Sequence, residues 1–495
     1  MWEEKLMYFL GLDIGSTCTK CQLFNENGDI LYYEANECDL INVDGETYAD
    51  IDKIIELTKQ CIKNANKVNK IDSISVSSFG ESFVLLDKDD NIIFKPMLYF
   101  DPRGEVEAQY VTDTIGNDVM YKEVGVVPQA LYSIYKLLWI KNNRPEIYEK
   151  ADKMLQMNEF IGYMLTKKRY VDYGMCSRTG VFDFKNKVFH KEIIEKIGLN
   201  YAHFSKPMPI GYVVGNITAE IANELGLKED CKFVLGSQDQ VCATIGAGAI
   251  YNGEAADGLG TVECITTIFD TPPTSIKLGE MGFPIVPFIE DRYCTYLLNY
   301  SSGSAVNWFR KDILHGYKGN EDSFFTYAEK NFKDTPSEIF MLPYLGGAAT
   351  PYQNVNAKAA FLNLTLDTTD ADLYQAILEG TSLEMLHNIN LIKDYGITVK
   401  SAIATGGGAN SKAWLQIKAD VMGIVLKTLR SSEGGLCGTA IIQAVAMGSA
   451  KDYKDALNTF VQYKDTFYPN EDKKVLYDKK YEKYKNLYIT LKNFL

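Results

Sequence analysis

Asp239 stands between two glutamines in the segment Gly236-Ser237-Gln238-Asp239-Gln240, so a carboxylate and two amides come together. A carboxylate can accept the proton of a hydroxyl group, and the amide of Gln240 can hold neighbouring hydroxyls. Phosphoryl transfer to a hydroxyl requires such a base together with positioning and charge neutralisation. The alternative is that Asp239 only caps the helix that the following small residues predict.

Three other segments combine glycine with hydroxyl or amide side chains. They are Asp13-Ile14-Gly15-Ser16-Thr17, Asp257-Gly258-Leu259-Gly260-Thr261 and Gly406-Gly407-Gly408-Ala409-Asn410-Ser411. Glycine allows the backbone to approach a phosphate group closely, and successive N–H groups can bind its oxygens. The first two segments share an Asp followed four residues later by a Thr, which suggests one unit that occurs twice. Each of them taken alone is also consistent with an ordinary hairpin turn.

The first of these segments predicts a site for phosphate and for a metal ion. Ser16 and Thr17 offer hydroxyl and N–H donors in the turn. Lys20 lies on the strand that follows, from which its ammonium group could reach the terminal phosphates. Asp13 is expected at the end of the first strand, and its carboxylate suits Mg²⁺, either directly or through water.

The third segment follows a short apolar strand, Ser401 to Ala404, and precedes a helix for which Ser411 is a suitable N-cap. A helix N-terminus after a glycine-rich turn offers N–H groups and partial positive charge to an anion. Consecutive glycines also leave flat backbone against which adenine or ribose can lie. No Gly-Lys-Ser/Thr follows, so the segment is not a Walker A loop, and a structural crossover is the alternative.

Two polar clusters in the first half of the chain predict a sugar-binding site. Glu81 follows the strand expected from Ile71 to Ser77, at the carboxyl end where open α/β sheets bind ligands. Asp101 and Arg103 follow Met97 to Phe100, which we also expect to be a strand. A carboxylate and a guanidinium this close can bind vicinal hydroxyls, although a surface turn with a weak ion pair is the alternative.

With 495 residues, the chain is longer than one hydrophobic core usually supports, so we expect two domains, at residues 1–249 and 250–495. Strands that alternate with helices predict a mixed α/β fold. We expect strands at 8–14, 19–25, 29–34, 263–269, 282–287 and 293–299, and helices at 52–66, 132–141, 158–165, 304–311, 371–390, 412–422 and 438–447. We expect the end of the chain, from 453 to 495, to pack as helix.

Composition and charge exclude several classes of function. The net charge of −14 and a pI near 5.0 disfavour nucleic acid and anionic membrane as partners. No run of 18 apolar residues occurs, and the start of the chain lacks the apolar core of a signal peptide, so we expect a cytoplasmic protein. The ten cysteines are expected to be reduced thiols. Cys18 and Cys21, three apart on a strand, would point to opposite faces, so we expect no metal or redox site there.

Taken together, these motifs resemble the FGGY family of carbohydrate kinases, and the resemblance extends over nearly the whole chain. The supporting segments are Ser133 to Trp139, Pro343 to Gly347 and Ala359 to Leu364. The resemblance implies two actin-like, ribonuclease H-like domains with ATP and Mg²⁺ in the cleft between them. By analogy with similar kinases, a homodimer is also implied.

The resemblance also implies roles for individual residues. Asp239 matches the catalytic base of the family. The positions that match its nucleotide-binding motifs are Ser16, Thr17 and Lys20 in the first phosphate loop, Thr261 in the second, Gly303 and Asn307 at a helix start, and Gly407, Gly408 and Asn410 in the adenosine loop.

Departures from the family pattern bear on the substrate. Glycerol kinases have an Arg-Glu pair where this chain has Gly80-Glu81, and xylulokinases usually have a His in place of Glu81. A Glu-Arg pair that is common in the family is replaced by Ala348-Ala349. We therefore expect ATP-dependent phosphorylation of a ketose or polyol, and not of glycerol. The alternative is an actin-like ATP-binding regulator or a chaperone-like ATPase that turns over no sugar.

Overall fold

The computed structural model describes residues 6–43, 45–314, 321–431 and 433–494, which form two compact units. Unit 1 comprises Met1–Gly248, Pro284–Tyr293 and Glu433–Val461, and unit 2 comprises Ala249–Phe283, Cys294–Ser432 and Gln462–Leu495. The chain first changes unit after Gly248 and later returns twice to unit 1. A single boundary near residue 249 therefore does not describe how the sequence is divided between the units.

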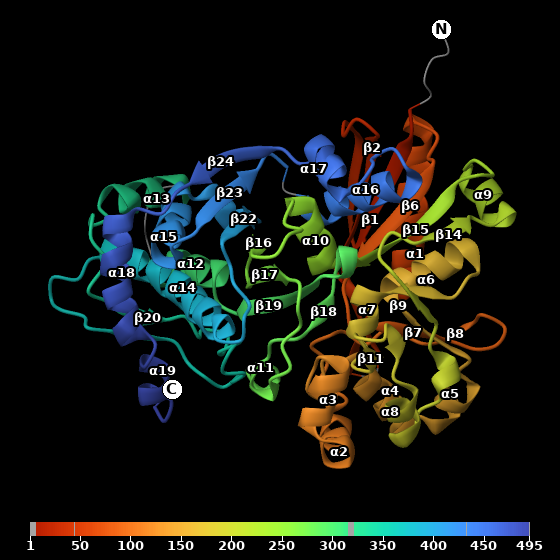
Figure 1. The fold of residues 1–495 in the computed structure, drawn as a ribbon, viewed down its shortest axis with the longest axis horizontal. Coiled ribbons are helices and arrows are strands. Elements are labelled where there is room, and N and C mark those ends of the chain that lie inside the picture. Colours follow the sequence, from red (N-terminus) through yellow and green to blue (C-terminus); the bar gives the residue numbers. More distant parts are fainter. Residues whose placement is uncertain (1–5, 44, 315–320, 432, 495) are drawn as a thin grey trace, which may run out of the picture. The chain divides into compact units, whose positions relative to one another are not determined.

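Unit 1 is built on a twisted six-stranded sheet (Figure 1). Its central strand β1 is antiparallel to β2 and parallel to β6, which is in turn parallel to β15. In spatial order the strands are β14 (Val213–Asn216), β15 (Lys232–Gln238), β6 (Ser73–Ser78), β1 (Tyr8–Ile14), β2 (Cys18–Asn25) and β3 (Ile30–Glu37).

Alternate residues of β1 face two different layers of helices. Leu10, Leu12 and Ile14 belong to a core cluster that includes residues of α1 (Ile51–Val68) and α6 (Met157–Thr166). Gly11 lies on the opposite face, where a Cβ atom would come within 2.2 Å of Thr439 Oγ1. Because side chains alternate along a strand, Asp13 shares the face of Gly11.

The helix on that face, α16 (Gly434–Met447), packs very closely against α10 (Asp239–Ala247). A Cβ atom on Gly246 would lie 1.9 Å from the carbonyl oxygen of Gly434, and one on Gly438 would lie 1.9 Å from that of Cys242. The small residues after Asp239 thus serve as a helix–helix contact. Glycine is required here because the two backbones touch.

Unit 2 repeats the strand arrangement of unit 1. Its strand β16 is antiparallel to β17 and parallel to β22, just as β1 is to β2 and β6. The spatial order is β19 (Tyr293–Asn299), β17 (Glu263–Phe269), β16 (Glu254–Leu259), β22 (Ser401–Thr405), β23 (Val425–Leu429) and β24 (Tyr463–Phe467). Asp13 and Asp257 lie on the corresponding strands β1 and β16, which agrees with the repeated Asp-to-Thr spacing in the sequence.

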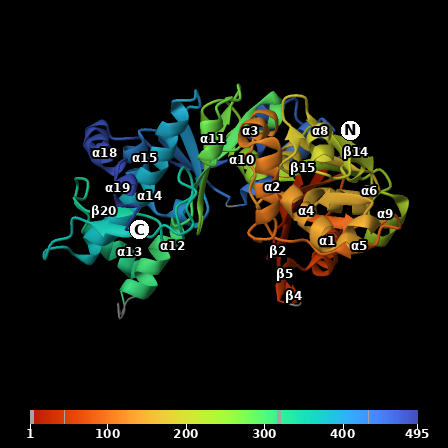
Figure 2. The same cartoon turned by 90° about the horizontal axis from the view of Figure 1, so that it is seen from below.

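The other elements complete each unit. The hairpin of β4 and β5 extends from the rest of unit 1 (Figure 2). In unit 1 the remaining elements are β4 (Leu40–Val43), β5 (Glu46–Ala49), β7 (Phe83–Leu86), β8 (Ile92–Phe94), α2 (Glu105–Ile115), α3 (Asn117–Val124), α4 (Ser133–Asn143), α5 (Pro145–Lys150), β9 (Lys153–Gln156), β10 (Tyr170–Asp172), α7 (Tyr173–Ser177), β11 (Phe182–Asp183), β12 (Val188–Phe189), α8 (Lys191–Lys196), β13 (Lys206–Met208), α9 (Ala219–Leu225), β18 (Val286–Pro287) and α17 (Tyr453–Phe460). In unit 2 they are α11 (Ile276–Glu280), α12 (Gly303–Trp308), α13 (Glu321–Lys330), β20 (Phe340–Leu342), β21 (Ala360–Leu362), α14 (Asp370–Lys393), α15 (Lys412–Met422), α18 (Glu471–Tyr484) and α19 (Leu487–Leu491).

Some expected elements are wrong. Met97 to Phe100 forms no strand, because Met97 makes only an isolated bridge to Tyr48 and the chain then turns. The strand expected at 282–287 is reduced to β18, since Gly282 adopts a left-handed conformation with φ of 82°. The helix expected from residue 453 to the end is interrupted by β24, which pairs with β23.

Candidate active site

Asp239 lies where β15 ends and α10 begins. The N-cap position belongs to Gln238, so the interpretation of Asp239 as the cap is wrong. The Asp239 carboxylate accepts a hydrogen bond of 2.6 Å from the backbone N–H of Gln240, whose side chain is half-buried. Burial raises the pKa of Asp239 to about 7, and the negative charges of Asp13 and Glu81 add to the increase. A carboxylate with this pKa suits proton transfer near neutral pH.

The pKa of Asp239 predicts the acidic limb of the pH profile. A base works only when deprotonated, and a raised carboxyl pKa means that the protonated, inactive form accumulates below about pH 7. We expect kcat/KM to fall about tenfold per pH unit between about pH 6 and 5. Steady-state rates in buffers of constant ionic strength measure this. A flat profile down to pH 5 would show that another group takes the proton.

Asp13, at the end of β1, presents its carboxylate close to β6 and α16. Ser77 Oγ donates a 2.8 Å hydrogen bond to Asp13 Oδ1, and a Cβ atom on Gly435 would lie 3.7 Å from the same oxygen. Burial raises the pKa of Asp13, while the bond from Ser77 lowers it. A desolvated carboxylate whose hydrogen bond comes from a neutral hydroxyl is a position where a divalent cation relieves the cost of burying charge.

The turn after Asp13 has the form that the sequence predicted. The Gly15 N–H donates to the carbonyl oxygen of Cys18 at 2.8 Å, which closes the turn and leaves Ser16 half-buried and Thr17 exposed. Lys20 on β2 forms an ion pair of 3.2 Å with Glu433, at the start of the segment that returns to unit 1. The ammonium group of Lys20 is therefore held by a carboxylate that is 413 residues away in sequence.

Glu81 is paired with Arg178, a residue that the sequence analysis missed. Both are buried, with 5% and 4% exposed surface, and Arg178 Nε donates to Glu81 Oε1 at 2.5 Å. Arg178 Nη2 also contacts Oε1, and the guanidinium lies 5.1 Å from the centre of the Tyr132 ring. Glu81 has a φ of 61°, which is strained for a residue with a side chain and persists only where the surroundings impose it.

Gly80 provides room for the aliphatic part of the Arg178 side chain. A Cβ atom at Gly80 would lie 3.3 Å from Arg178 Cγ and 3.3 Å from Gln238 Cγ. The arginine beside Glu81 comes from the end of α7. From the sequence, the ion pair of Arg178 and Glu81 could have been suspected only by considering the glycine at position 80 together with an arginine elsewhere in the chain.

Asp101 and Arg103 form a fixed, largely buried pair and not a loose surface contact. Arg103 Nη2 lies 2.5 Å and Nε 2.9 Å from the two carboxylate oxygens of Asp101, and Nη1 donates to Tyr48 Oη at 2.9 Å. Arg103 Nη1 also lies 2.7 Å from Glu46. The side chains are 13% and 8% exposed, so the pair is rigid.

Lys136 is a further buried cation in this part of unit 1. Its Nζ donates to the carbonyl oxygens of Ala130 and Leu131 at 3.0 and 2.6 Å. Burial lowers its pKa to about 8, although Glu81 and Asp101 partly counteract this. Lys136 therefore fixes the loop before α4 and contributes positive charge near Glu81.

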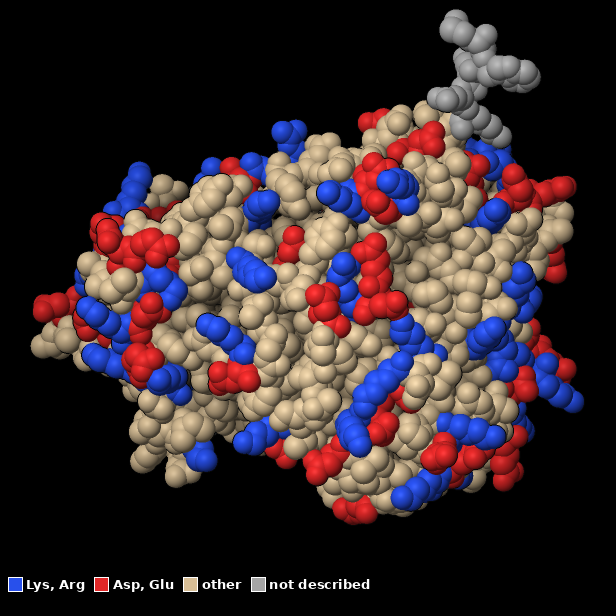
Figure 3. Space-filling model, in the orientation of Figure 1, with Lys and Arg blue, Asp and Glu red and all other residues tan. Residues whose placement is uncertain are grey.

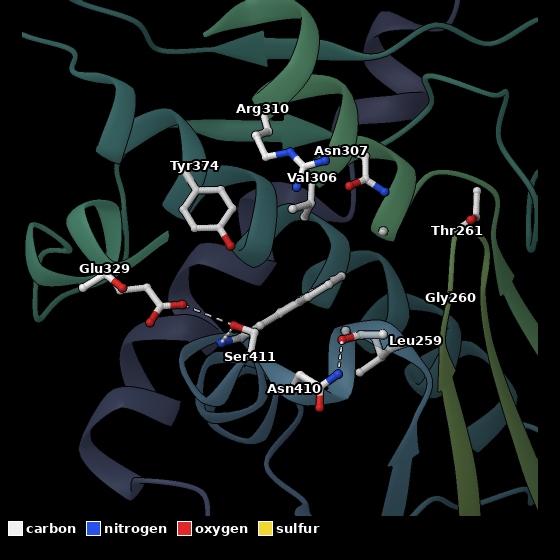
Figure 4. A pocket seen from close by; sticks show the side chains of 15 residues that line it. Leu259, Gly260, Thr261, Val306, Asn307, Arg310, Glu329, Tyr374, Asn410 and Ser411 are labelled. Atoms are coloured by element: carbon white, nitrogen blue, oxygen red, sulfur yellow. Dashed lines mark hydrogen bonds between the residues drawn. The ribbon is translucent and has the colours of Figure 1, made fainter. Parts of the chain in front are cut away.

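Unit 2 contains a pocket of about 780 Å³ that brings its predicted nucleotide residues together (Figure 4). Those residues are Thr261, Gly303, Asn307, Gly407, Gly408 and Asn410. Figure 4 shows Asn307 and Arg310 opposite Asn410 and Ser411 across the cavity. The lining side chains that sequence reasoning missed include Arg310, Thr326, Glu329, Tyr374 and Trp414.

The glycine-rich turn of this pocket is supported by capping and packing. Ser411 caps α15 by accepting the N–H of Trp414 at 3.2 Å, as the sequence predicted, and its hydroxyl also lies 3.3 Å from Glu329. Gly406 adopts a φ of 80° that favours glycine. The N-terminus of α15 is thus directed to the cavity by backbone that only glycine forms readily.

Two adjacent glycines of this turn allow a matched test of ligand binding. A Cβ atom at Gly407 meets nothing within 4 Å, so we expect Gly407→Ala to keep the melting temperature but to raise the Kd for ATP about tenfold, because the methyl group takes up ligand space. A Cβ atom at Gly408 would lie 2.9 Å from both Leu259 and Trp414, so Gly408→Ala should cost about 1–3 kcal/mol of stability. Calorimetry and thermal unfolding measure the two effects. Unchanged ATP affinity in Gly407→Ala would place the nucleotide elsewhere.

A buried ionic cluster lies behind the pocket. Lys418 of α15 lies 3.0 Å from Asp257 and also contacts Glu263, and all three residues are 0% exposed. Ser302, just before α12, donates a 2.5 Å hydrogen bond to Glu263. The cluster connects α15, the strands β16 and β17, and the start of α12. It therefore holds three segments that line the pocket in a fixed arrangement.

From the sequence, Cys18 and Cys21 were considered as a pair, and no metal or redox site was expected there. Cys21 lies near Cys61 and Glu34, with one possible ligand atom from each within 4.8 Å of the others, and Cys18 is not part of this group. Cys21 and Cys61 are buried on β2 and α1, and Glu34 already accepts hydrogen bonds from Tyr32 and Asn36. The thiol that lies close to Cys21 is therefore that of Cys61, and only the folding of the chain brings these two residues together.

The N- and C-terminal domain models of the FGGY family of carbohydrate kinases match residues 8–246 and 280–447. The chain belongs to this family. It is therefore a carbohydrate kinase of the FGGY family, with the mixed α/β fold of two domains that the sequence predicted and with ATP as its phosphoryl donor.

Relatives of this FGGY kinase match along its whole length. A xylulose kinase of Staphylococcus epidermidis is 25% identical over 97% of this chain and 96% of that protein, and a gluconokinase of Bacillus subtilis is 27% identical over 94% and 92%. The solved structures of a gluconate kinase and a xylulose kinase from Lactobacillus acidophilus each have a TM-score of 0.90 and 25% identity, and cover 98% of both chains. None of the helices among the described residues combines the length and apolar character needed to cross a membrane.

Proposed function

We propose that this kinase transfers the γ-phosphoryl group of ATP to a hydroxyl of a ketose or polyol, with Asp239 as the catalytic base. The observation that carries the proposal is the position of Asp239 at the start of α10, with a pKa of about 7 and with Asp13 and Glu81 as charged neighbours. Phosphoryl transfer depends on positioning and electrostatics more than on covalent chemistry, and these residues supply both.

Each group of residues has its own role in this proposal. Asp239 accepts the proton of the attacking hydroxyl, while Glu81, Gln240 and the fixed pair of Asp101 and Arg103 hold the other hydroxyls of the acceptor. The pocket of unit 2 binds the nucleotide. The N–H and hydroxyl groups of Ser16 and Thr17, together with Lys20, contact the phosphates.

Asp13 is the residue that we propose as the ligand for Mg²⁺. Its desolvated carboxylate, with Ser77 as a neutral hydrogen-bond donor, offers the oxygen ligand that this cation prefers. Mg²⁺ bound with ATP supplies neutralisation of phosphate charge. The corresponding Asp257 of unit 2 does not fit such a role, because Lys418 already occupies its carboxylate.

The family assignment favours turnover over the alternative of an ATP-binding regulator.

On the face shown in Figure 3, basic and acidic side chains are interspersed, without the continuous basic surface that nucleic acid requires. The relatives named above act on xylulose or gluconate, and this chain differs from the family pattern at Gly80-Glu81 and at Ala348-Ala349.

A coupled assay of ADP release tests the proposal. The acceptors are pentuloses, hexuloses and polyols, each offered with Mg-ATP, and the product is identified by its phosphate ester. We expect at least one acceptor to raise ADP release well above the rate with water alone. If ATP binds and no acceptor is phosphorylated, the binding-only alternative is right.

A further inference from the structure

We propose that Arg178 contacts the acceptor and that its pairing with Glu81 makes this kinase select uncharged sugars or polyols over sugar acids. The inference rests on the proposed function, because it concerns the specificity of the same site. Its basis is the buried ion pair itself and the way in which the neighbouring cations are already neutralised.

The geometry of the pair leaves one carboxylate oxygen as an acceptor for the substrate, while the guanidinium lies against the ring of Tyr132. Both Nε and Nη2 of Arg178 meet Oε1 of Glu81, which leaves Oε2 as a hydrogen-bond acceptor for a hydroxyl. The pair lies beside Gln238, and its charges act on Asp239. A hydroxyl held by Glu81 would therefore belong to the same small molecule whose reacting hydroxyl meets Asp239.

The charges around this position disfavour an anionic acceptor. Arg178 is neutralised by Glu81, Arg103 by Asp101 and Glu46, and Lys20 by Glu433. Lys136 donates to two carbonyl oxygens, and burial has lowered its pKa. Asp239, which acts as the base only when it is deprotonated, adds further negative charge. A carboxylate on the acceptor would thus meet anions, while each of these cations already has a partner.

The strained backbone at Glu81 indicates that the pair is maintained for function. A φ of 61° costs of order 1–3 kcal/mol in a residue with a side chain, and a glycine at this position would avoid that cost. The side chain of Glu81 is needed opposite Arg178, and it lies three residues beyond the end of β6, where open sheets bind their ligands.

Pairs of acceptors that differ only in charge test this inference. Ribitol with ribonate and sorbitol with gluconate are matched in length, and each pair is supplemented by the corresponding ketose. For the protein as it exists, we expect kcat/KM to be at least about 100-fold higher for the uncharged members, because like-charge contacts cost several factors of ten. A sugar acid that is phosphorylated as well as its uncharged counterpart overturns the inference and leaves the proposed function intact.

Variants of the pair separate a contact role from a structural one. Glu81→Gln leaves Arg178 without its anionic partner, so we expect the ratio of kcat/KM for acid over polyol to rise about tenfold. Arg178→Met should lower kcat/KM for polyols about 100-fold without creating activity on acids, and Arg178→Lys should restore part of it. Arg169→Met, which removes a guanidinium that binds the carbonyls of Ala202 and His203, should leave the ratio unchanged.

ATP affinity and melting temperature report whether each variant folds. If Arg178→Met fails to fold, kinetics of Glu81→Gln and Arg178→Lys with the same pairs of acceptors decide whether Arg178 contacts the acceptor. An unchanged ratio in folded Glu81→Gln, or unchanged polyol kinetics in folded Arg178→Met, overturns the inference. If no acceptor is phosphorylated although ATP binds, the proposed function fails and this inference fails with it.

Discussion

Asp239→Asn is expected to lower kcat about 1,000-fold while the Kd for ATP stays within about twofold. Asparagine keeps the size of the side chain but cannot accept the hydroxyl proton, and general-base catalysis contributes about 10²- to 10⁴-fold to a rate. The nucleotide pocket lies in unit 2 and its lining does not include Asp239. Steady-state kinetics with the best acceptor, together with calorimetry of ATP binding, measure both quantities.

The pH profile of this variant is its internal control. The acidic limb that reports the pKa of Asp239 should disappear from the residual activity, because no group with that pKa then remains at the reacting hydroxyl. Near wild-type turnover in Asp239→Asn would remove the residue from its role. A loss of ATP affinity equal to the loss of kcat would point to damage to the fold.

Lys418→Met is expected to lower the free energy of unfolding by about 3–5 kcal/mol. Methionine matches the aliphatic part of lysine, but it leaves the carboxylates of Asp257 and Glu263 buried with no cation beside them. Removing one member of a buried ion cluster costs more than the cluster contributes, because the remaining charges are desolvated and unpaired. Thermal and denaturant unfolding measure the change.

Two comparisons show whether charge is the cause. Lys412→Met alters the same helix at a side chain that is 76% exposed, and should change stability by less than about 0.5 kcal/mol. In Lys418→Met the folded-state pKa of Asp257, which burial already raises to about 7, rises further above its unfolded value, so the folded protein takes up a proton and the deficit shrinks as the pH falls towards 5. A deficit that does not vary with pH would indicate lost packing.

Both units have an aspartate at the same strand position, but the two aspartates have different partners. Asp13 of β1 accepts a hydrogen bond from the hydroxyl of Ser77, whereas Asp257 of β16 is neutralised by Lys418. One carboxylate can therefore serve a cation, and the other serves the architecture of the nucleotide pocket. The repeated spacing in the sequence revealed the duplication but not this division of roles.

The bounds of several local elements, and six of the residues that line the pocket of unit 2, followed from sequence patterns. β1, β17, β19 and α15 have the bounds that apolar runs and the Ser411 cap predicted. These features depend on neighbouring residues, so the sequence contains the information needed. Where strands were expected at 97–100 and 282–287, a turn and a left-handed glycine override the apolar pattern.

Most of the contacts that the sequence analysis missed are ion pairs between residues far apart in the sequence. Arg178 meets Glu81 across 97 residues, Lys418 meets Glu263 across 155, and Lys20 meets Glu433 across 413. No periodicity or spacing connects residues so far apart. Electrostatic pairing in a protein interior depends on which side chains the folded chain brings together, so only coordinates reveal it.

The amino-acid sequence by itself determined the family, the duplicated strand–turn units, six residues that line the pocket of unit 2 and Asp239 as the candidate base. The tertiary structure decided how these residues are charged and held. It showed that Asp239 has a pKa of about 7, that Arg178 pairs with Glu81, and that Lys418 is buried between two carboxylates. Burial and contacts between distant residues set these properties, because desolvation and Coulomb interactions depend on position in space.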